Sequence, residues 1–284
     1  MRIFLCLVAT IQLGFGKAKI GVMETAFGLR CSVESVRLAK ESGYSGVQIH
    51  TGRLEKNGQM TISNPTIQKD FLKASKTHGV EIFSLCAGAM NRIDVTKPGE
   101  TRKKGRAIML QSLEACHKLH CKILLFPFFG PSNFQQDDEK LKGVANFIRE
   151  ILPIARKHGV TIGIESPVTF ERVMELFEEL DNPKDLQMYY DTGNMGRKNE
   201  DINKALKTLG GKQICEIHLK PKKGIHFGNN DSTDLEKLAK TLDEIGYGGW
   251  LVFEQGGGVE KGKTELSKEN LKGVRKLAAL REKG

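Results

Sequence analysis

The sequence of 284 residues predicts a single α/β domain folded as a (β/α)8 barrel. Three observations support this fold class: eight short apolar runs of strand length, amphipathic segments between them, and a length close to the ~250 residues typical of such barrels. The hydrophobic content of 39% is enough to bury a sizeable core. A doubly wound open sheet is the competing arrangement, but no G-x-G-x-x-G follows the first expected strand.

The expected strands follow one another at intervals of one βα unit. They comprise residues 20–23, 46–49, 81–87, 122–129, 160–165, 186–191, 214–219 and 250–254. Between them, segments such as 141–152 and 235–245 carry apolar residues at helical spacing. The second of these segments opens with a capping box, Thr233-x-x-Glu236. Glycines such as Gly79 and Gly159 precede strand-like runs and are expected to end the helices.

Residues 1–18 differ in composition from the rest of the chain. Arg2 is followed by an apolar run over residues 3–15 and then by G-K-A, with small residues at the two positions that a signal peptidase inspects. This pattern predicts an export signal cut after Ala18, a barrel domain over 19–284, and a periplasmic or secreted protein. The alternative is an apolar extension packed under the barrel of a cytoplasmic protein. The run is shorter than the roughly 20 residues that a membrane-spanning helix needs.

The charge and the cysteines exclude several classes of protein. The formal net charge is +10, from 44 Lys and Arg against 34 Asp and Glu, but it is spread along the chain rather than gathered into one basic tract. We therefore expect no nucleic-acid partner, and no apolar run predicts a membrane partner. The six cysteines form no C-x-x-C pair and are too sparse for a disulfide-stapled domain, so we expect buried thiols.

Charged or imidazole side chains end the last four expected strands. They are Glu165, Asp191, His218 and Glu254, separated by 26, 27 and 36 residues, or one βα unit each. In a barrel these side chains converge at the carboxyl-terminal mouth, where three carboxylates repel one another unless a cation is present. A single such residue is usually a helix cap or an ion-pair partner, but four at equivalent positions favour one divalent metal. Three oxygen donors and one imidazole suit Mn(II), Mg(II), Fe(II) or Co(II) better than a structural zinc.

Four motifs in the second half of the chain resemble a known family. They are G-I-E-S-P at 163–167, Y-D-T-G-N at 190–194, I-H-L-K at 217–220 and G-Y-G-G-W-L-V-F-E at 246–254. These segments look like the sugar phosphate isomerase/epimerase family of xylose-isomerase-like TIM barrels, which includes ketose 3-epimerases. The resemblance covers about residues 19–280. It implies that the four strand-end residues bind one divalent metal, usually Mn(II), with zinc among the alternatives, and that Glu165 and Glu254 exchange the substrate proton.

The chemistry that this resemblance implies agrees with the residue types. Removing a proton beside a carbonyl requires a base, a cation that stabilises the enediolate, and an acid that returns the proton. Glu165 and Glu254 can serve opposite faces in an epimerisation, or one of them can shuttle a proton between neighbouring carbons in an aldose–ketose isomerisation. The sequence leaves both open, together with dehydration or cleavage by a related barrel lyase. The expected partner is a small sugar or sugar phosphate, and the oligomeric state is not fixed.

The expected substrate contacts depart from the family's pattern. Epimerases of this family commonly carry His three residues beyond the metal-binding Asp and Arg six residues beyond the metal-binding His. This chain has Asn194 and Gly224 at those positions. We expect Asn194 to donate a hydrogen bond to the substrate. Lys220, Lys222 or Lys223 can replace the Arg as a point charge, without its planar fork, and Lys220 is the candidate contact. His50, which ends the second strand, faces the same mouth and is a third candidate contact.

Two functions from other classes remain as alternatives. An apurinic-site endonuclease of this fold needs several extra histidines at the ends of early strands for a multi-zinc cluster. Only His50 qualifies, because the third and fourth expected strands end in Ala87 and Phe129. A non-catalytic carbohydrate-binding barrel is the second alternative, and proton exchange on a sugar would distinguish it from an isomerase.

Overall fold

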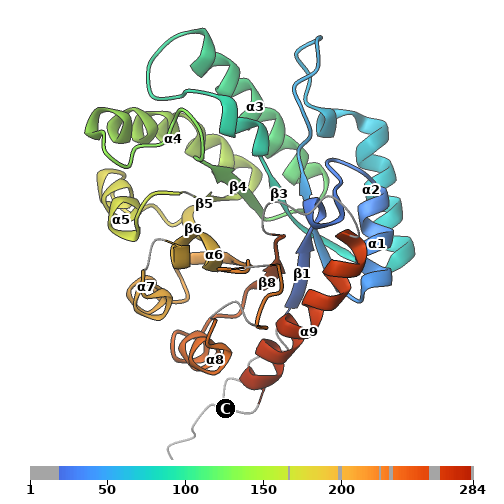
Figure 1. Ribbon diagram of the computed structural model, residues 1–284. Coiled ribbons are helices and arrows are strands. Elements are labelled where there is room, and N and C mark those ends of the chain that lie inside the picture. The colour runs from blue at the N-terminus through green and yellow to red at the C-terminus, as the bar shows by residue number, and fades with distance from the viewer. Residues whose placement is uncertain are drawn as a thin grey trace, which may run out of the picture.

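The computed structural model describes residues 19–165, 167–197, 200–223, 225–229, 233–255 and 263–282. Its strands form one closed parallel barrel in which each strand pairs with the next and β8 pairs with β1 (Figure 1). The strands are β1 (Lys19–Met23), β2 (Gly46–His50), β3 (Glu81–Cys86), β4 (Ile123–Pro127), β5 (Thr161–Glu165), β6 (Leu186–Asp191), β7 (Ile214–Leu219) and β8 (Trp250–Phe253). The predicted barrel is confirmed.

Helices surround the barrel on its outer side (Figure 1). The α-helices are α1 (Glu34–Ser42), α2 (Pro65–His78), α3 (Glu100–Lys118), α4 (Asp138–His158), α5 (Phe170–Glu179), α6 (Thr192–Arg197), α7 (Ile202–Leu209), α8 (Leu235–Glu244) and α9 (Lys263–Arg281), and short 3-10 helices are η1 (Glu24–Phe27), η2 (Thr61–Ser63) and η3 (Gly88–Arg92). Gly79 and Gly159 end α2 and α4 in the left-handed conformation, as expected. The predicted cap of α8 is wrong by one residue, because Asp234 rather than Thr233 accepts the Lys237 backbone N–H.

Two apolar clusters fill the fold. The larger lies between the strands and the helices, and the smaller contains Phe83 and Trp250, whose rings stack with centroids 4.3 Å apart. Gly21 and Gly46 make room for these rings, because a Cβ at either position would lie 2.5 Å from one of them. The barrel interior is therefore packed with side chains below the mouth, and this packing leaves the ends of the strands as the place for a ligand.

Three further predictions concern the N-terminal segment, the cysteines and membrane-spanning helices. Residues 1–18, for which the sequence predicts an export signal, lie outside the described residues. Five cysteines lie in the described part of the chain, all of them free thiols, and four of these are buried. No helix among the described residues is both long enough and apolar enough to cross a bilayer.

Candidate active site

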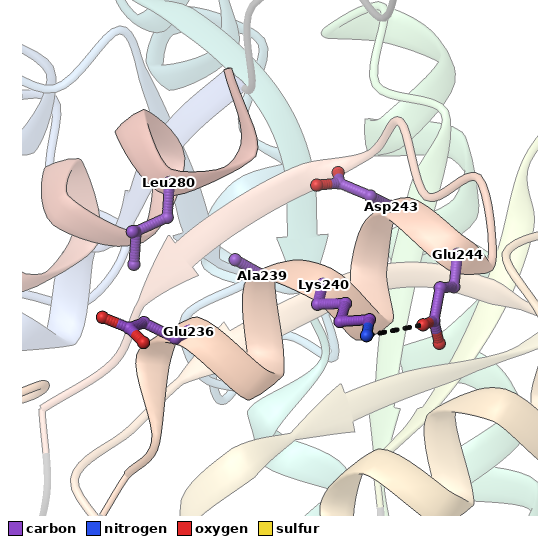
Figure 2. Close-up of a pocket in the computed structure, with 6 residues that line it drawn as sticks. All are labelled: Glu236, Ala239, Lys240, Asp243, Glu244 and Leu280. Atoms are coloured by element: carbon purple, nitrogen blue, oxygen red, sulfur yellow. Dashed lines mark ion pairs between the residues drawn. The ribbon is translucent and has the colours of Figure 1, made fainter. Parts of the chain in front are cut away.

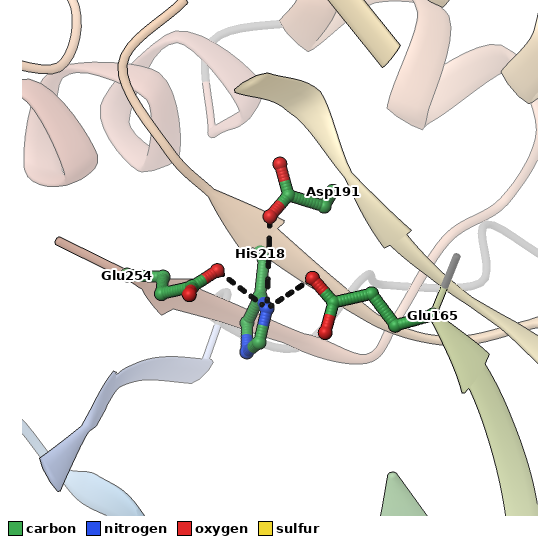
Figure 3. Close-up of side chains that lie close together, drawn as sticks. All are labelled: Glu165, Asp191, His218 and Glu254. Carbon is green, nitrogen blue, oxygen red and sulfur yellow. Dashed lines mark ion pairs between the residues drawn. The ribbon is translucent and has the colours of Figure 1, made fainter. Parts of the chain in front are cut away.

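Glu165, Asp191, His218 and Glu254 converge at the mouth of the barrel (Figure 3). Each offers a ligand atom, and these atoms all lie within 4.8 Å of one another. The ring of His218 occupies the centre, and its Nδ1 lies 3.6 Å from Glu165 Oε1, 4.0 Å from Asp191 Oδ2 and 3.1 Å from Glu254 Oε2. The predicted convergence of the four side chains, called here the four-residue cluster, is confirmed.

Strand register brings the cluster together. Asp191 on β6 pairs directly with His218 on β7, and Glu165 is the last residue of β5. Glu254 follows the last residue of β8, and its backbone N–H donates to the Leu219 carbonyl of β7. Parallel strands of a barrel end at the same rim, so residues far apart in sequence meet there.

The cluster fits a divalent cation. Asp191 Oδ2, His218 Nδ1 and Glu254 Oε2 are buried and make no hydrogen bond, although each lies at ion-pair distance from another charged group of the site. Buried polar atoms without a hydrogen bond are rare in folded proteins, and these three atoms all face the same point. Carboxylate oxygens with one imidazole nitrogen form a donor set suited to Mn(II), Mg(II), Fe(II), Co(II) or Zn(II).

The electrostatics of the cluster show how strongly it favours positive charge. Burial raises the pKa of Asp191 well above its ordinary range, and Lys220 opposes that shift. Burial also acts to raise the pKa of Glu254, but Lys220 and His218 outweigh it and the pKa is lowered. For His218, burial acts to lower the pKa, and the carboxylates of Glu254 and Glu165 outweigh it and raise the pKa to about 10. The carboxylates of the cluster therefore attract positive charge, here the His218 imidazolium and the Lys220 ammonium group.

A buried polar network fixes the orientation of His218. Its Nε2 lies 3.0 Å from Gln48 Oε1, and the Gln48 amide donates to Tyr189 OH at 2.9 Å and to Ser84 Oγ at 3.1 Å. Ser84 in turn donates to Glu216 Oε2 at 2.8 Å. With its amide nitrogen used in this way, Gln48 presents an acceptor to His218, so Nε2 carries a proton and Nδ1 faces the cluster.

Sequence analysis missed this network, although a signal for it exists. Gln48, Tyr189 and Glu216 each lie two positions before a predicted site residue on the same strand. Alternate residues of a strand face the same side, so these three polar side chains share the interior face with the site. Polar residues at that spacing in an apolar strand indicate a second layer below the mouth.

A cavity of about 920 Å³ opens onto the cluster. Glu165, Glu254 and Lys220 line it, whereas Asp191 and His218 do not. Asp191 is 1% exposed and His218 is fully buried. The two glutamates are thus the members of the cluster that a molecule in the cavity can reach.

His50 lines the same cavity, as the sequence predicts. Its backbone N–H donates to the buried carboxylate of Glu24 at 2.6 Å, and its Nδ1 accepts the Gly52 N–H at 2.9 Å. Gly88 approaches so closely that a Cβ there would lie 2.1 Å from His50 Nε2. Burial, with a smaller contribution from Arg30, lowers the pKa of His50 to about 4. The imidazole is therefore neutral at physiological pH.

Asn194 and Lys220 contact the cluster itself. Asn194 Nδ2 donates to Glu165 Oε1 at 3.1 Å, and its backbone N–H donates to Asp191 Oδ1 at 2.7 Å. Lys220 Nζ lies 3.1 Å from Glu254 Oε1 and 3.4 Å from Asp191 Oδ2. Both residues orient or neutralise carboxylates, and their contact with a substrate stays a prediction. Gly224 lies outside the described residues.

The fold and the site define a class: a (β/α)8 barrel with three carboxylates and one histidine at the carboxyl ends of its last four strands. The model of the xylose isomerase-like TIM barrel family matches residues 36–277. The chain belongs to that family.

Solved structures of similar fold include several sugar epimerases. The apo form of the 3-keto-D-glucoside 4-epimerase YcjR from E. coli has a TM-score of 0.73 and 19% identity, covering 92% of this chain and 100% of its own. D-psicose 3-epimerase in the presence of D-fructose has a TM-score of 0.76 and 13% identity, covering 93% and 99%. The IOLI protein with a bound zinc atom has a TM-score of 0.70 and 18% identity, covering 93% and 98%. These likenesses establish the fold. No curated protein sequence gives a significant match.

The ends of the early strands bear on the nuclease alternative. Strands β2, β3 and β4 end in His50, Cys86 and Pro127, so the early strands do not supply the extra histidines that a multi-zinc nuclease needs.

A separate cavity of about 440 Å³ lies between α8 and α9, lined by Glu236, Ala239, Lys240, Asp243, Glu244 and Leu280 (Figure 2). It shares no lining residue with the cavity at the mouth, and an exposed acidic surface of this kind needs no ligand.

Proposed function

We propose that this protein is a metal-dependent isomerase or epimerase that moves a proton beside the carbonyl of a sugar or sugar derivative through an enediolate. The observation that carries the proposal is the placement of the two glutamates. Glu165 and Glu254 reach the cavity from β5 and the end of β8, which are not neighbours in the barrel, while Asp191 and His218 are sealed from it. Two carboxylates facing one cavity from different sides can act as base and acid.

Glu165, Asp191, His218 and Glu254 would hold one divalent metal, for which we propose Mn(II). When bound, the metal would polarise the substrate carbonyl and stabilise the negative charge of the enediolate. Three of these residues have a buried atom that makes no hydrogen bond, and this supports the assignment.

The protein's own groups supply the proton transfer. Lys220 and His218 lower the pKa of Glu254 against the effect of burial, so this carboxylate is ionised, as a metal ligand and a base must be. Glu165 has its Oε1 held by Asn194, which orients the carboxylate toward the cavity. If the two glutamates act on opposite faces of one carbon, the product is an epimer, and if one of them serves two neighbouring carbons, the product is an isomer.

The comparisons support a sugar as the ligand. The similar structures include proteins named as 3-keto-D-glucoside 4-epimerase, L-ribulose 3-epimerase and D-psicose 3-epimerase. D-allulose 3-epimerase was solved in complex with D-allulose. An isomerase-type reaction on a small sugar is the activity that these names have in common.

Deuterium incorporation from heavy water across a panel of ketoses and aldoses tests the proposal. With Mn(II) present, we expect label at the carbon beside the carbonyl of the substrate, and after chelation we expect none. Separation of the products distinguishes epimer from isomer, and loss of water would indicate a lyase. Binding of sugars without any labelling would contradict the proposal and favour a carbohydrate-binding barrel.

We also propose that residues 1–18 are removed on export. The strands of the described residues close the barrel among themselves, since β1 pairs with both β2 and β8. N-terminal sequencing of protein from the native source should start at Lys19, and a sequence starting at Met1 would contradict export.

A further inference from the structure

The first half of the chain contributes most of the positive charges that line the cavity. Besides Lys220, four cations line the cavity: Arg30, Arg53, Arg92 and Lys104. All four come from the first half of the chain. Arg30 precedes α1, Arg53 follows β2, Arg92 ends η3 and Lys104 lies in the first turns of α3. No carboxylate of the four-residue cluster belongs to this half.

Three of these cations have no partner of their own. Arg53 Nε lies 3.1 Å from Glu55 Oε1, so Arg53 has a carboxylate partner, although the pair is exposed. Arg30, Arg92 and Lys104 make no ion pair and no side-chain hydrogen bond with any residue in the described part of the chain. Their charges are directed at solvent and at the cavity.

The charges of the cavity therefore do not balance. A divalent ion together with Lys220 would neutralise the three carboxylates of the cluster, and Glu55 pairs with Arg53. The charges of Arg30, Arg92 and Lys104 remain, and a concave site focuses their field onto whatever lies inside it. The positive charge of Arg30 is felt inside the cavity by His50. Burial is the main cause of the lowered pKa of His50, and the charge of Arg30 is the second cause.

We propose that Arg30, Arg92 and Lys104 form a subsite for an oxyanion group, a phosphate or a carboxylate, at the end of the sugar remote from its reacting carbonyl. Arginine matches the paired oxygens of both groups through its planar fork, and lysine adds a point charge. The apolar surfaces of Pro127 and Phe129 line the same cavity and can contact the carbon skeleton. The subsite rests on the proposed function, and it restricts the substrate to acidic sugar derivatives.

The test compares neutral and acidic forms of one sugar on the full chain loaded with Mn(II). D-fructose, D-fructose 6-phosphate and D-fructuronate are titrated by calorimetry, and deuterium exchange is measured on the same three probes. The variants are Arg30→Gln, Arg92→Gln and Lys104→Gln, each of which removes one charge. Lys103→Gln is the matched control, because it removes the charge next to Lys104 on α3 at an exposed position that pairs with Glu100 and does not line the cavity. Thermal unfolding confirms that each variant is folded.

We expect one or both acidic sugars to bind wild-type protein at least ~10-fold more tightly than D-fructose. A hydrogen bond to a charged group corresponds to roughly 10-fold or more in affinity, so each of the three variants should reduce that preference by about 10-fold. Lys103→Gln should leave the preference unchanged. Preference for the phosphate or for the carboxylate identifies which of the two groups the subsite holds.

Equal binding of the three probes, no binding of the acidic ones, or an equal loss of preference in Lys103→Gln and Arg92→Gln would overturn the subsite. The last result would mean that the surface attracts anions by its general charge. Failure of the proposed function gives a different pattern: acidic sugars would still bind in an Arg92-dependent way, but no probe would acquire deuterium. Exchange on D-fructose without any preference for the acidic probes would support the isomerase and reject the subsite.

Discussion

The strand ends of β5–β8 and those of β1–β4 lie on the same rim of the barrel but carry different chemistry. The second half supplies three carboxylates and a histidine, and the first half supplies a neutral histidine and a set of cations. The two histidines show the contrast most simply. Neighbouring carboxylates raise the pKa of His218 to about 10 against the effect of burial, whereas burial and Arg30 lower the pKa of His50 to about 4.

This difference separates what the fold fixes from what the local sequence fixes. A closed parallel barrel places all strand ends on one rim, whatever their residues. The residues at each end and in each loop then decide whether that part of the rim holds a cation or an anion. We infer that one half of the mouth performs the chemistry and that the other half selects the substrate.

The largest expected effect comes from removing the two glutamates that face the cavity. Glu165→Gln and Glu254→Gln keep an oxygen near the metal but lose the proton acceptor, so proton exchange at saturating Mn(II) should fall by about 10² to 10⁴-fold. Glu55→Gln is the control, because Glu55 lines the cavity but pairs with Arg53. If both glutamine variants kept wild-type exchange, His50 or Lys220 would have to carry the proton.

A smaller effect is expected below the cluster. Gln48→Leu removes the acceptor that holds His218 Nε2. Loss of such a partner typically weakens metal binding by about 10- to 100-fold, and we expect that loss in a titration with Mn(II). Gln187→Leu, on β6, is the control, since Gln187 donates to the Lys212 carbonyl and not to the site. Equal metal affinities of wild type and Gln48→Leu would show that the network does not position His218.

The fold and the four-residue cluster could be predicted because both depend on regular features. Strand runs repeat at even spacing, and Glu165, Asp191 and His218 occupy the same place in successive units. The cationic side could not be predicted in the same way, because Arg30 lies in the connection after η1 and Arg92 ends the short 3-10 helix η3, and no local pattern specifies the direction of either segment. Lys104 reaches the cavity from a helix, where it looks like an ordinary exposed lysine.

One sequence pattern was missed altogether. Residues 257–264, between β8 and α9, match G-x-x-x-x-G-K-[ST], a pattern found in phosphate-binding loops. In P-loop proteins this pattern joins a strand to a helix within an open sheet, so its presence favours the doubly wound alternative. The closed barrel overturns that alternative. Residues 256–262 lie outside the described part of the chain.

The smallest expected effect is a pH dependence of the free energy of unfolding, which follows from the neutral state of His50. Its folded pKa of about 4 lies below the ordinary value of 6.5, so the unfolded chain binds more protons between these pH values. The contribution of His50 to stability is therefore complete above pH 6.5 and is lost as the pH falls toward 4. Between pH 7 and pH 5 the loss is about 2 kcal/mol.

Chemical denaturation of wild type and His50→Gln at several pH values measures this contribution. The difference in unfolding free energy between the two proteins should shrink as the pH falls from 7 to 5. Gln187→Leu, which removes no titratable group, is the control. A difference that does not change with pH would mean that His50 titrates normally, and the electrostatic contrast between the two halves would then be weaker than described.

Anomalous diffraction from crystals containing Mn(II) tests the division of the mouth most directly. The account predicts one strong peak within about 2.0 to 2.6 Å of ligand atoms from Glu165, Asp191, His218 and Glu254. It predicts none beside Arg30 or Arg92. A metal bound elsewhere, or a cluster that stays without metal at saturating Mn(II), would contradict the claim that the second half of the barrel is built to hold a catalytic metal.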